Sequence, residues 1–402
     1  MKNMKQAALG LAILLTACSS RESSSSIPSR DYGPNYDPIN SFVDQSYLYG
    51  MTDLSWSEHN WNGTSWQDTH DLIEALGAKS VRVWLHCNWI MKNPDTYDEN
   101  GLALARKIVE DWDRRGMQMI GMNHSNFHAT GYVNSKSTTA KPARDLTEGS
   151  EYMKWLEDYE RTWKNLVLQF PEITYWEIDN EDNNDVFFGK LSGGTFTLRQ
   201  KADIYTDMMF YASRGIHEAN PKAITVMGGL ITSSAETFLQ YIYDNIDSGD
   251  FWSTYPDDFF QVACWHPYVT NFRKEAFKKL NNDIYAVIKQ NEQKDKKVFM
   301  TEFGFSEENV SVQVQADYIP LLFETLKELP YVESLHYFRM FDVLSSSWGS
   351  TAEKTFGLFT DPNNHGVAGE NKTLAAPKKS AYAYQKAAGG TGSLTTYQEK
   401  VN

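Results

Sequence analysis

Two short segments of this sequence carry the side chains best suited to chemistry. Residues 175–181 (YWEIDNE) and 298–304 (VFMTEFG) each read as a hydrophobic strand that ends on a carboxylate, Glu181 in the first and Glu302 in the second. Because such strands are buried along their length, a carboxylate at the end emerges where the sheet meets solvent. Two carboxylates at the same end of one sheet can perform glycoside hydrolysis, in which one protonates the leaving oxygen and the other attacks or stabilises the sugar carbon. For either glutamate alone, the alternative is a solvated residue at the end of a strand.

Strands and helices are expected to alternate along the whole region that contains both glutamates. The expected strands are rich in β-branched and aromatic residues, and several expected helices end at a glycine or proline, as at Gly77, Gly116 and Pro171. The pattern predicts eight strands, at 47–53, 80–85, 117–122, 173–180, 223–227, 259–265, 298–302 and 332–341. It predicts helices at 66–76, 102–115, 151–170, 198–219, 235–245, 274–290, 312–329 and 377–386.

Eight strand–helix units in one unbroken run predict an α/β fold, a single (β/α)8 barrel. A doubly wound sheet is the main alternative, but no G-x-G-x-x-G turn follows the first strand and no P-loop occurs in the sequence. In such barrels the active site lies at the carboxyl ends of the strands. Both glutamates fall there, on the fourth and seventh strands. The long segments 124–149 and 342–376 are expected to wall a cleft.

The span from about residue 47 to residue 386 resembles the clan A glycoside hydrolases, (β/α)8 retaining enzymes that include families 5 and 39. Their signature is an Asn-Glu pair that ends strand four and a Glu that ends strand seven, matched here by Asn180-Glu181 and by Glu302 within residues 301–304. The resemblance implies that Glu181 is the general acid/base and Glu302 the nucleophile. It also implies that Asn180 binds the 2-hydroxyl of the sugar.

Other positions match the clan's pattern less completely. Arg82 in residues 81–84 (VRVW) matches an Arg on strand two, and His266 and Tyr268 match an aromatic and His pattern on strand six. The Trp that closes strand eight in the clan has no clear counterpart in residues 337–341 (YFRMF), and Phe341 or Trp348 are the candidates to replace it.

The alternation of residues on the second strand predicts a buried ion pair. Val81, Val83 and Leu85 share one parity and are expected to face the helices, so that Arg82 points into the barrel. An unpaired guanidinium is very costly there. A partner in Glu302 would keep that carboxylate ionised, as a nucleophile requires. The alternative is an Arg that ties the barrel together through Glu177 or Asp179.

Glu181 has the opposite requirement, because a general acid needs a pKa raised toward neutrality. We expect the neighbouring charge of Glu302 to raise the pKa of Glu181. The Tyr268 hydroxyl is a candidate donor to Glu302, with a packed aromatic ring as the alternative. His124 is a candidate contact to sugar hydroxyls, although a loop histidine is usually only solvated, and Trp84 is a candidate stacking platform or a core residue.

The first residues predict a lipid anchor. Residues 1–17 have a basic start and a short apolar run, which is typical of a secretory signal and too short to span a membrane. Residues 15–18 (LTAC) resemble the bacterial lipobox, which implies a lipid on Cys18, with an ordinary signal peptide as the alternative. Residues 18–31 then form a polar tether, 32–390 the catalytic domain and 391–402 a tail. These features predict a protein anchored in the bacterial cell envelope, at the outer membrane.

Composition limits the partners. The net charge of −14 argues against nucleic acid, whose binding requires neutralisation of phosphates, and it disfavours strongly anionic glycans. The 12 Trp and 22 Tyr suit sugar binding but also suit a core. Cys87 and Cys264 are expected to be free thiols, because their strands lie apart in the barrel. We expect a monomer with no metal or other cofactor, and a polysaccharide or oligosaccharide as substrate.

Two functions of different class are compatible with these features. The first is a retaining glycoside hydrolase of β-linked glycans, an endo-β-glycanase or, as the alternative, an exo-acting β-glycosidase. The second is a non-catalytic glycan-binding lipoprotein on a degenerate barrel, which would retain the aromatic residues and lose a carboxylate. The presence of Glu181, Glu302 and Asn180 favours the enzyme. A barrel enzyme that uses a metal or a phosphate would need ligand clusters or a glycine-rich loop that the sequence lacks.

Overall fold

A computed structural model describes residues 43–56, 65–124, 140–188, 190–191, 195–248, 253–344, 352–361 and 375–394. Its main sheet has parallel strands in the order β10-β11-β12-β13-β1-β2-β5-β7-β9. Read from β1 onward and around the ring, this order is the order of the strands along the chain. The fifth strand is interrupted at Gly228 and Gly229, which divide it into β9 and β10. The barrel strands are β1 (Tyr49–Asp53), β2 (Ser80–Trp84), β5 (Gln118–Asn123), β7 (Tyr175–Ile178), β9 (Ile224–Met227), β10 (Leu230–Ile231), β11 (Ala263–His266), β12 (Val298–Phe303) and β13 (Val332–Tyr337).

The sheet curls until its two ends meet. β9 pairs with the chain that enters β11, because the Met227 N–H donates to the carbonyl of Val262 (2.9 Å) and the Gln261 N–H donates to the carbonyl of Thr225 (2.9 Å). Val226 and Val262 form a parallel bridge at the same place. The predicted (β/α)8 barrel is therefore confirmed, and every strand ends with its carboxyl end on the same side.

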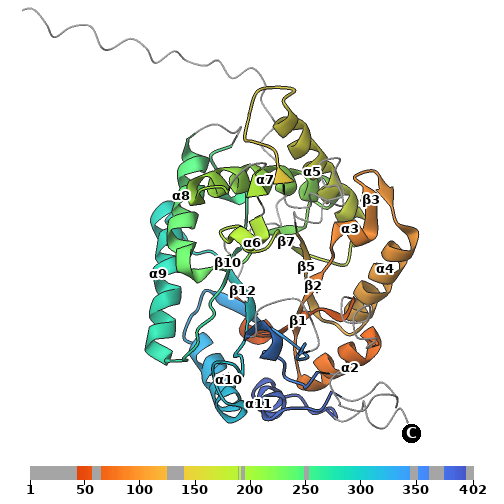
Figure 1. Cartoon of the computed structure of the whole chain (residues 1–402), viewed down its shortest axis with the longest axis vertical. Helices are drawn as coiled ribbons and strands as arrows, with labels where there is room; N and C mark the ends of the chain where they lie inside the picture. Colours follow the sequence, from red (N-terminus) through yellow and green to blue (C-terminus); the bar gives the residue numbers. More distant parts are fainter. Residues whose placement is uncertain are drawn as a thin grey trace, which may run out of the picture.

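Each barrel strand is followed by a helix when β9 and β10 are taken together as the fifth strand, and Figure 1 shows these helices in a ring around the strands. The predicted bounds of α2 and α7 match the structure, and Gly77 ends α2 in a left-handed conformation. The ring helices are α2 (Trp66–Leu76), α4 (Glu99–Arg114), α5 (Glu151–Leu168), α7 (Leu198–Ala219), α8 (Ala235–Asp247), α9 (Lys274–Glu292), α10 (Val312–Leu326) and α11 (Lys379–Ala388).

Several short elements were not predicted, and most of them lie in the segments that follow the barrel strands. The predicted strands four, six and eight are longer than β7, β11 and β13. Strand eight is shorter at its carboxyl end, strand six at its amino end and strand four at both ends. The additional elements are α3 (Cys87–Ile90), the antiparallel pair β3 (Met91–Asn93) and β4 (Thr96–Tyr97), the parallel pair β6 (Ala140–Lys141) and β8 (Lys190–Leu191), α6 (Asp185–Phe188), and the 3-10 turns Gln45–Tyr47, Thr232–Ser234, Pro256–Asp258 and Ala352–Thr355.

A ladder of aromatic rings holds β7, the strand that leads to Glu181. On α5, Trp155, Tyr159 and Trp163 follow one another at a spacing of four residues, and their ring centroids lie 5.9 and 6.3 Å apart. Trp163 then meets Trp176 of β7 edge-on at 6.1 Å. Gly121 of β5 makes room for the Trp176 ring, since a Cβ atom at Gly121 would lie 2.8 Å from it. The helix therefore fixes the position of the strand that leads to Glu181.

Cys87 and Cys264 form no disulfide with each other, as predicted, and both side chains are buried. Cys18 lies outside the described residues. In the part of the chain that the structure describes, no helix combines the length and the apolar character needed to cross a membrane.

Candidate active site

Arg82 points into the barrel, and its position confirms the predicted alternation on β2. Val81 and Val83 lie in the core between the strands and the helices, whereas the Arg82 side chain is completely buried on the other face. The interior of the barrel below it is filled by a small cluster of side chains, namely Ile120, Tyr175, Val226, Val262, Cys264 and Phe299.

Arg82 binds the expected partner Glu302 and also Glu177, one of the two carboxylates named in the alternative. Its Nε and Nη2 atoms donate to Oε2 and Oε1 of Glu177 at 2.6 and 2.8 Å, while Nη1 donates to Oε1 of Glu302. Nη2 also donates to Oδ1 of Asn180 at 2.7 Å. The buried guanidinium therefore ties the barrel together and also orients the predicted nucleophile.

The backbone after β7 departs from a regular strand at Asp179, Asn180 and Glu181. Asp179 and Glu181 both have positive φ, 72° and 53°, which non-glycine residues adopt rarely and at a cost. These two residues break the strand alternation, so that the Asn180 amide reaches Arg82 and the Glu181 carboxyl reaches His266. The Glu181 N–H donates to the carbonyl of Gly229 (2.9 Å), which fixes the turn against the fifth strand.

β12 also departs from regular strand alternation, in this case through a bulge. The pairing with β13 shifts register between Met300 and Phe303, so the residues between them have no regular partner. As a result, the adjacent side chains of Thr301 and Glu302 both reach the site, where Thr301 contacts Glu177 and Glu302 contacts Arg82.

His266, at the end of β11, lies between the two glutamates. Its Nδ1 atom is 2.9 Å from Oε1 of Glu181 and 3.9 Å from Oε2 of Glu302. One carboxylate oxygen from each glutamate and one ring nitrogen of His266 all lie within 4.8 Å of one another. The structure thus brings the two predicted carboxylates and His266 together, and burial lowers the pKa of His266 to about 4.

Both oxygens of Glu302 receive hydrogen bonds. Arg82 donates to Oε1, and the Tyr268 hydroxyl donates to Oε2 at 3.2 Å. The Tyr268 ring is itself held between Phe303 and Phe356, with centroids 5.9 and 5.4 Å away. The predicted Tyr268–Glu302 contact is therefore present, and the carboxylate has a single orientation.

Burial raises the pKa of Glu181 from 4.5 to about 7. The Asn184 side chain, which donates to Oε2 at 3.0 Å, and the charge of Arg82 both act in the opposite direction, whereas the charge of Glu353 raises the pKa slightly. The direction matches the sequence-based expectation, but the cause does not, because loss of water dominates and the charge of Glu302 is not among the main causes.

The raised pKa of Glu181 predicts a pH-dependent gain of stability for Glu181→Gln. As pH rises from 4.5 to 7, the unfolded chain releases this proton before the folded protein does, so the wild-type free energy of unfolding falls over this range. The difference between the two pKa values corresponds to about 3 kcal/mol at most. Chemical denaturation should therefore show Glu181→Gln gaining stability relative to wild type between pH 4 and pH 8.

The control for this measurement is Glu110→Gln on the surface of α4, where the side chain is 55% exposed. Its difference from wild type should not change with pH. If the Glu181→Gln curve ran parallel to wild type across the whole range, Glu181 would not titrate near neutrality.

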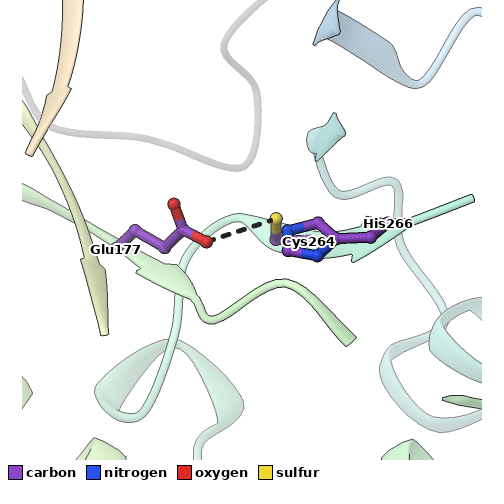
Figure 2. Close-up of side chains that lie close together, drawn as sticks. All are labelled: Glu177, Cys264 and His266. Atoms are coloured by element: carbon purple, nitrogen blue, oxygen red, sulfur yellow. Dashed lines mark hydrogen bonds between the residues drawn. The ribbon is translucent and has the colours of Figure 1, made fainter. Parts of the chain in front are cut away.

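Glu177, Cys264 and His266 form a second close group inside the barrel. Figure 2 shows the Glu177 carboxylate directed at the Cys264 sulfur, 3.9 Å away, with the His266 ring beside it. The atoms of this group lie within 4.8 Å of one another, a spacing that could hold a metal ion. However, both oxygens of Glu177 already bind Arg82, so positive charge occupies the place that a cation would need. We assign no metal to it.

The other residues predicted to contact sugar differ in their exposure. Trp84 lies beside Arg82, whose guanidinium carbon is 5.5 Å from its ring, and the partly exposed side chain lies at the carboxyl end of β2. His124 is buried, 3.5 Å from Asp179, and burial lowers its pKa to about 4. Phe341 is completely buried against Phe359 in the core, which rules it out as an exposed floor of the sugar site.

Trp348, the other candidate for that floor, lies outside the described residues, as do parts of both long segments expected to wall the cleft.

Sequence reasoning missed Thr301 and Gly229 as residues of the site. The Gly229 N–H donates to Oε1 of Glu177 at 3.1 Å, and a Cβ atom at Gly229 would lie 2.0 Å from Nε2 of His266. Glycine is therefore required by the close approach of the His266 ring. The Gly228-Gly229 pair was the available signal, because adjacent glycines at the end of a barrel strand indicate a close approach.

Residues 44–333 match the family model described as cellulase, glycosyl hydrolase family 5. The chain belongs to this family. It is a glycoside hydrolase on a (β/α)8 barrel, as predicted from Asn180, Glu181 and Glu302. No curated protein sequence matches it.

Solved structures with the same fold are distant in sequence. A family 39 glycoside hydrolase from Bacteroides cellulosilyticus WH2 matches with a TM-score of 0.55 and 15% identity, over 87% of this chain and 65% of that chain. A subfamily 18 member of family 5 from Bifidobacterium longum subsp. longum, in complex with Manβ1-4GlcNAc, matches with a TM-score of 0.58 and 13% identity, over 85% and 77%. An exo-β-1,4-mannosidase from Opitutaceae bacterium strain TAV5 matches with a TM-score of 0.59 and 14% identity, over 88% and 61%.

Proposed function

We propose that this hydrolase cleaves β-glycosidic bonds by double displacement, with Glu302 as the nucleophile and Glu181 as the general acid/base. The single observation that supports this best is the separation of less than 4.8 Å between a Glu181 oxygen and a Glu302 oxygen. Retaining enzymes hold their carboxyl groups roughly 5–5.5 Å apart, whereas inverting enzymes need about 6.5–9.5 Å to admit a water molecule.

In the first step, Glu302 attacks the anomeric carbon while Glu181 gives its proton to the departing oxygen. Arg82 and Tyr268 aim the two oxygens of Glu302, and this orientation removes the need to order the nucleophile in each turnover. A pKa of about 7 leaves Glu181 protonated below neutral pH, as a general acid must be.

In the second step, Glu181 has lost its proton and takes one from water, whose oxygen attacks the anomeric carbon and releases Glu302. The two inversions restore the starting configuration. Within the site, Oδ1 of Asn180 is occupied by Arg82, so its Nδ2 hydrogens are the donors left for a sugar hydroxyl. Trp84 offers a partly exposed ring at the same edge of the barrel, where sugar rings would stack.

We further propose an endo-acting enzyme on a β-linked polysaccharide, which the cellulase description of the matching family model favours. An exo-acting β-glycosidase is the second candidate. The observation in its favour is that structures with this fold include a glucosidase from Croceicoccus marinus and the exo-β-1,4-mannosidase.

Incubation of the purified domain with a panel of β-linked polysaccharides and oligosaccharides should release sugars from at least one of them. An endo-acting enzyme should give mixed oligosaccharides early in the reaction, while an exo-acting enzyme should give one small product. Proton NMR of the first product should show the β-anomer before mutarotation. An α-anomer as first product would contradict double displacement.

We also propose that the mature protein is anchored to the cell envelope through a lipid on Cys18, on the basis of residues 15–18 after an apolar run. Cys18→Ser should move the protein from the membrane fraction to the soluble fraction after expression in a Gram-negative host. Ser19→Ala, next to the anchor, is the control and should remain with membranes. If the Cys18→Ser protein still sediments with membranes, the anchor lies elsewhere.

A further inference from the structure

Thr301, which no step of the mechanism uses, lies at the centre of a buried hydrogen-bond network. Its hydroxyl oxygen is 2.9 Å from Oε1 of Glu177, 3.0 Å from Nε2 of His266 and 3.1 Å from the sulfur of Cys264. A hydroxyl has one hydrogen to donate and two lone pairs to accept with. Three partners therefore use all of its capacity, and the direction of each bond can be worked out.

The hydrogen of the Thr301 hydroxyl points to Glu177. Oε1 of Glu177 also receives hydrogen bonds from Nη2 of Arg82 (2.8 Å) and from the Gly229 N–H (3.1 Å), and the Cys264 thiol lies 3.9 Å away as a weaker donor. Every neighbour of this oxygen is therefore a donor, and it acts only as an acceptor. With its hydrogen used, the Thr301 oxygen can only accept hydrogen bonds, and the Cys264 thiol has one hydrogen to share between Thr301 and Glu177. The hydrogen between Thr301 and His266 therefore belongs to Nε2 of His266.

This assignment determines whether Nδ1 of His266 donates a hydrogen bond to Glu181 or accepts one. His266 is completely enclosed, and burial lowers its pKa to about 4, so that near neutral pH the ring carries one hydrogen. That hydrogen is on Nε2, which leaves Nδ1 as a lone-pair acceptor 2.9 Å from Oε1 of Glu181. Only the protonated carboxyl group can fill this contact, because a carboxylate oxygen facing a lone pair has no hydrogen to share.

We propose that Thr301 is a positioning residue that fixes His266 as the Nε2–H tautomer, so that the imidazole accepts a hydrogen bond from the acid form of Glu181 and favours that form. The proposal rests on the role of Glu181 as general acid/base proposed above. It explains why Thr301 and Glu302 need to reach the site together through the bulge in β12. It also gives Arg82 a second effect, since its pairing with Glu177 sets the direction of the whole network.

Other charges act on the same two groups and remain unchanged in the test below. The groups that face Glu181 and His266 come from several elements: Arg82 of β2, Glu177 of β7, Asn184 after β7, Tyr268 after β11, Glu302 of β12, His336 of β13 and Glu353 of the 3-10 turn Ala352–Thr355.

The first test measures the tautomer of His266 in the wild-type protein. NMR of the whole protein labelled with ¹⁵N-histidine distinguishes the two tautomers, and His266→Asn assigns the signal. Near neutral pH the wild type should show His266 protonated on Nε2, and Thr301→Ser, which keeps the hydroxyl, should show the same. Protonation on Nδ1 in the wild type would overturn the proposal.

The second test uses Thr301→Val, which keeps the shape and removes the hydroxyl. The Nε2–H group then has no acceptor there, so the tautomer with hydrogen on Nδ1 is favoured and donates to the Glu181 carboxylate. The basic limb of kcat/KM on the natural glycoside should move to lower pH by about one unit or more. An activated aryl glycoside, whose leaving group needs no proton, should show no such shift, and Thr301→Ser should restore the wild-type profile.

Thr325→Val is the matched control, because Thr325 is also buried and donates to the Leu321 carbonyl within α10, which runs along the outside of the barrel. It should leave the pH profile unchanged. An unshifted basic limb in Thr301→Val would overturn the inference and leave the proposed hydrolysis intact. An Nε2–H tautomer in a protein that hydrolyses no glycoside would instead contradict the proposed function and leave the assigned hydrogen bonds standing.

Discussion

Replacement of Glu302 by alanine is expected to abolish hydrolysis of natural glycosides and activated aryl glycosides alike, by about 10⁴-fold or more. The nucleophile is needed whichever group departs. Glu181→Ala should lower kcat/KM on natural glycosides by about 10²–10⁴-fold, because their leaving groups need a proton, and should largely spare this parameter on aryl glycosides that leave unaided. Steady-state kinetics on one substrate of each kind measures the difference.

Azide separates the two roles further. In Glu181→Ala it should speed turnover of the glycosyl-enzyme, because a small anion needs no general base, and should give a β-glycosyl azide with retained configuration. In Glu302→Ala it should yield at best the inverted product.

Glu110→Ala, on the exposed surface of α4, is the control and should behave as wild type. Equal losses on both substrates for both variants, with no azide effect, would contradict the assignment. A swapped pattern would mean that Glu181 and Glu302 have each other's roles.

Arg82→Lys is expected to cost both activity and stability, although it preserves the charge. A lysine has one nitrogen and no planar fork, so it cannot serve Glu177, Glu302 and Asn180 together as Arg82 does. Partners of the buried guanidinium would be left without hydrogen bonds, which costs about 3–5 kcal/mol for a broken buried pair. We expect a fall in the melting temperature and a loss of kcat/KM of at least about 10²-fold on both natural and aryl glycosides, because the nucleophile loses its orientation.

Arg106→Lys is the matched control. Arg106 on α4 also binds two carboxylates, Glu110 and Glu172, but its side chain is 31% exposed, and such pairs contribute little. It should change the melting temperature slightly and the activity not at all. An Arg82→Lys protein as active as wild type would show that Arg82 does not orient Glu302.

Much of the fold was predictable because the signals that specify it are local. The amphipathic pattern and the helix stops predicted the bounds of α2 and α7. In the structure, Gly77 ends α2, and the Thr197 and Gln200 side chains cap the first turn of α7. Alternation of apolar residues placed Arg82 inside the barrel, since a strand sends successive side chains to opposite faces. Strand order then brought Glu181 and Glu302 to the same end.

The short elements after the strands were not predictable in the same way. The bounds of β7 and β13 depend on where the neighbouring strand stops donating hydrogen bonds, which no local pattern records. Phe341 illustrates the limit: its type and position suggested a sugar platform, but the Phe359 ring, from later in the segment that follows β13, packs against it.

The sequence by itself therefore determined the barrel, the two carboxylates and the inward arginine. Residue type and spacing specify these features because helix ends and strand alternation depend on residues that are close along the chain. Only the tertiary structure decided how the site works. The left-handed residues Asp179 and Glu181 and the bulge that contains Thr301 break the alternation on which sequence reasoning depends. The pKa of Glu181 rises mainly through burial, and burial is a property of every element that surrounds the side chain and excludes water from it.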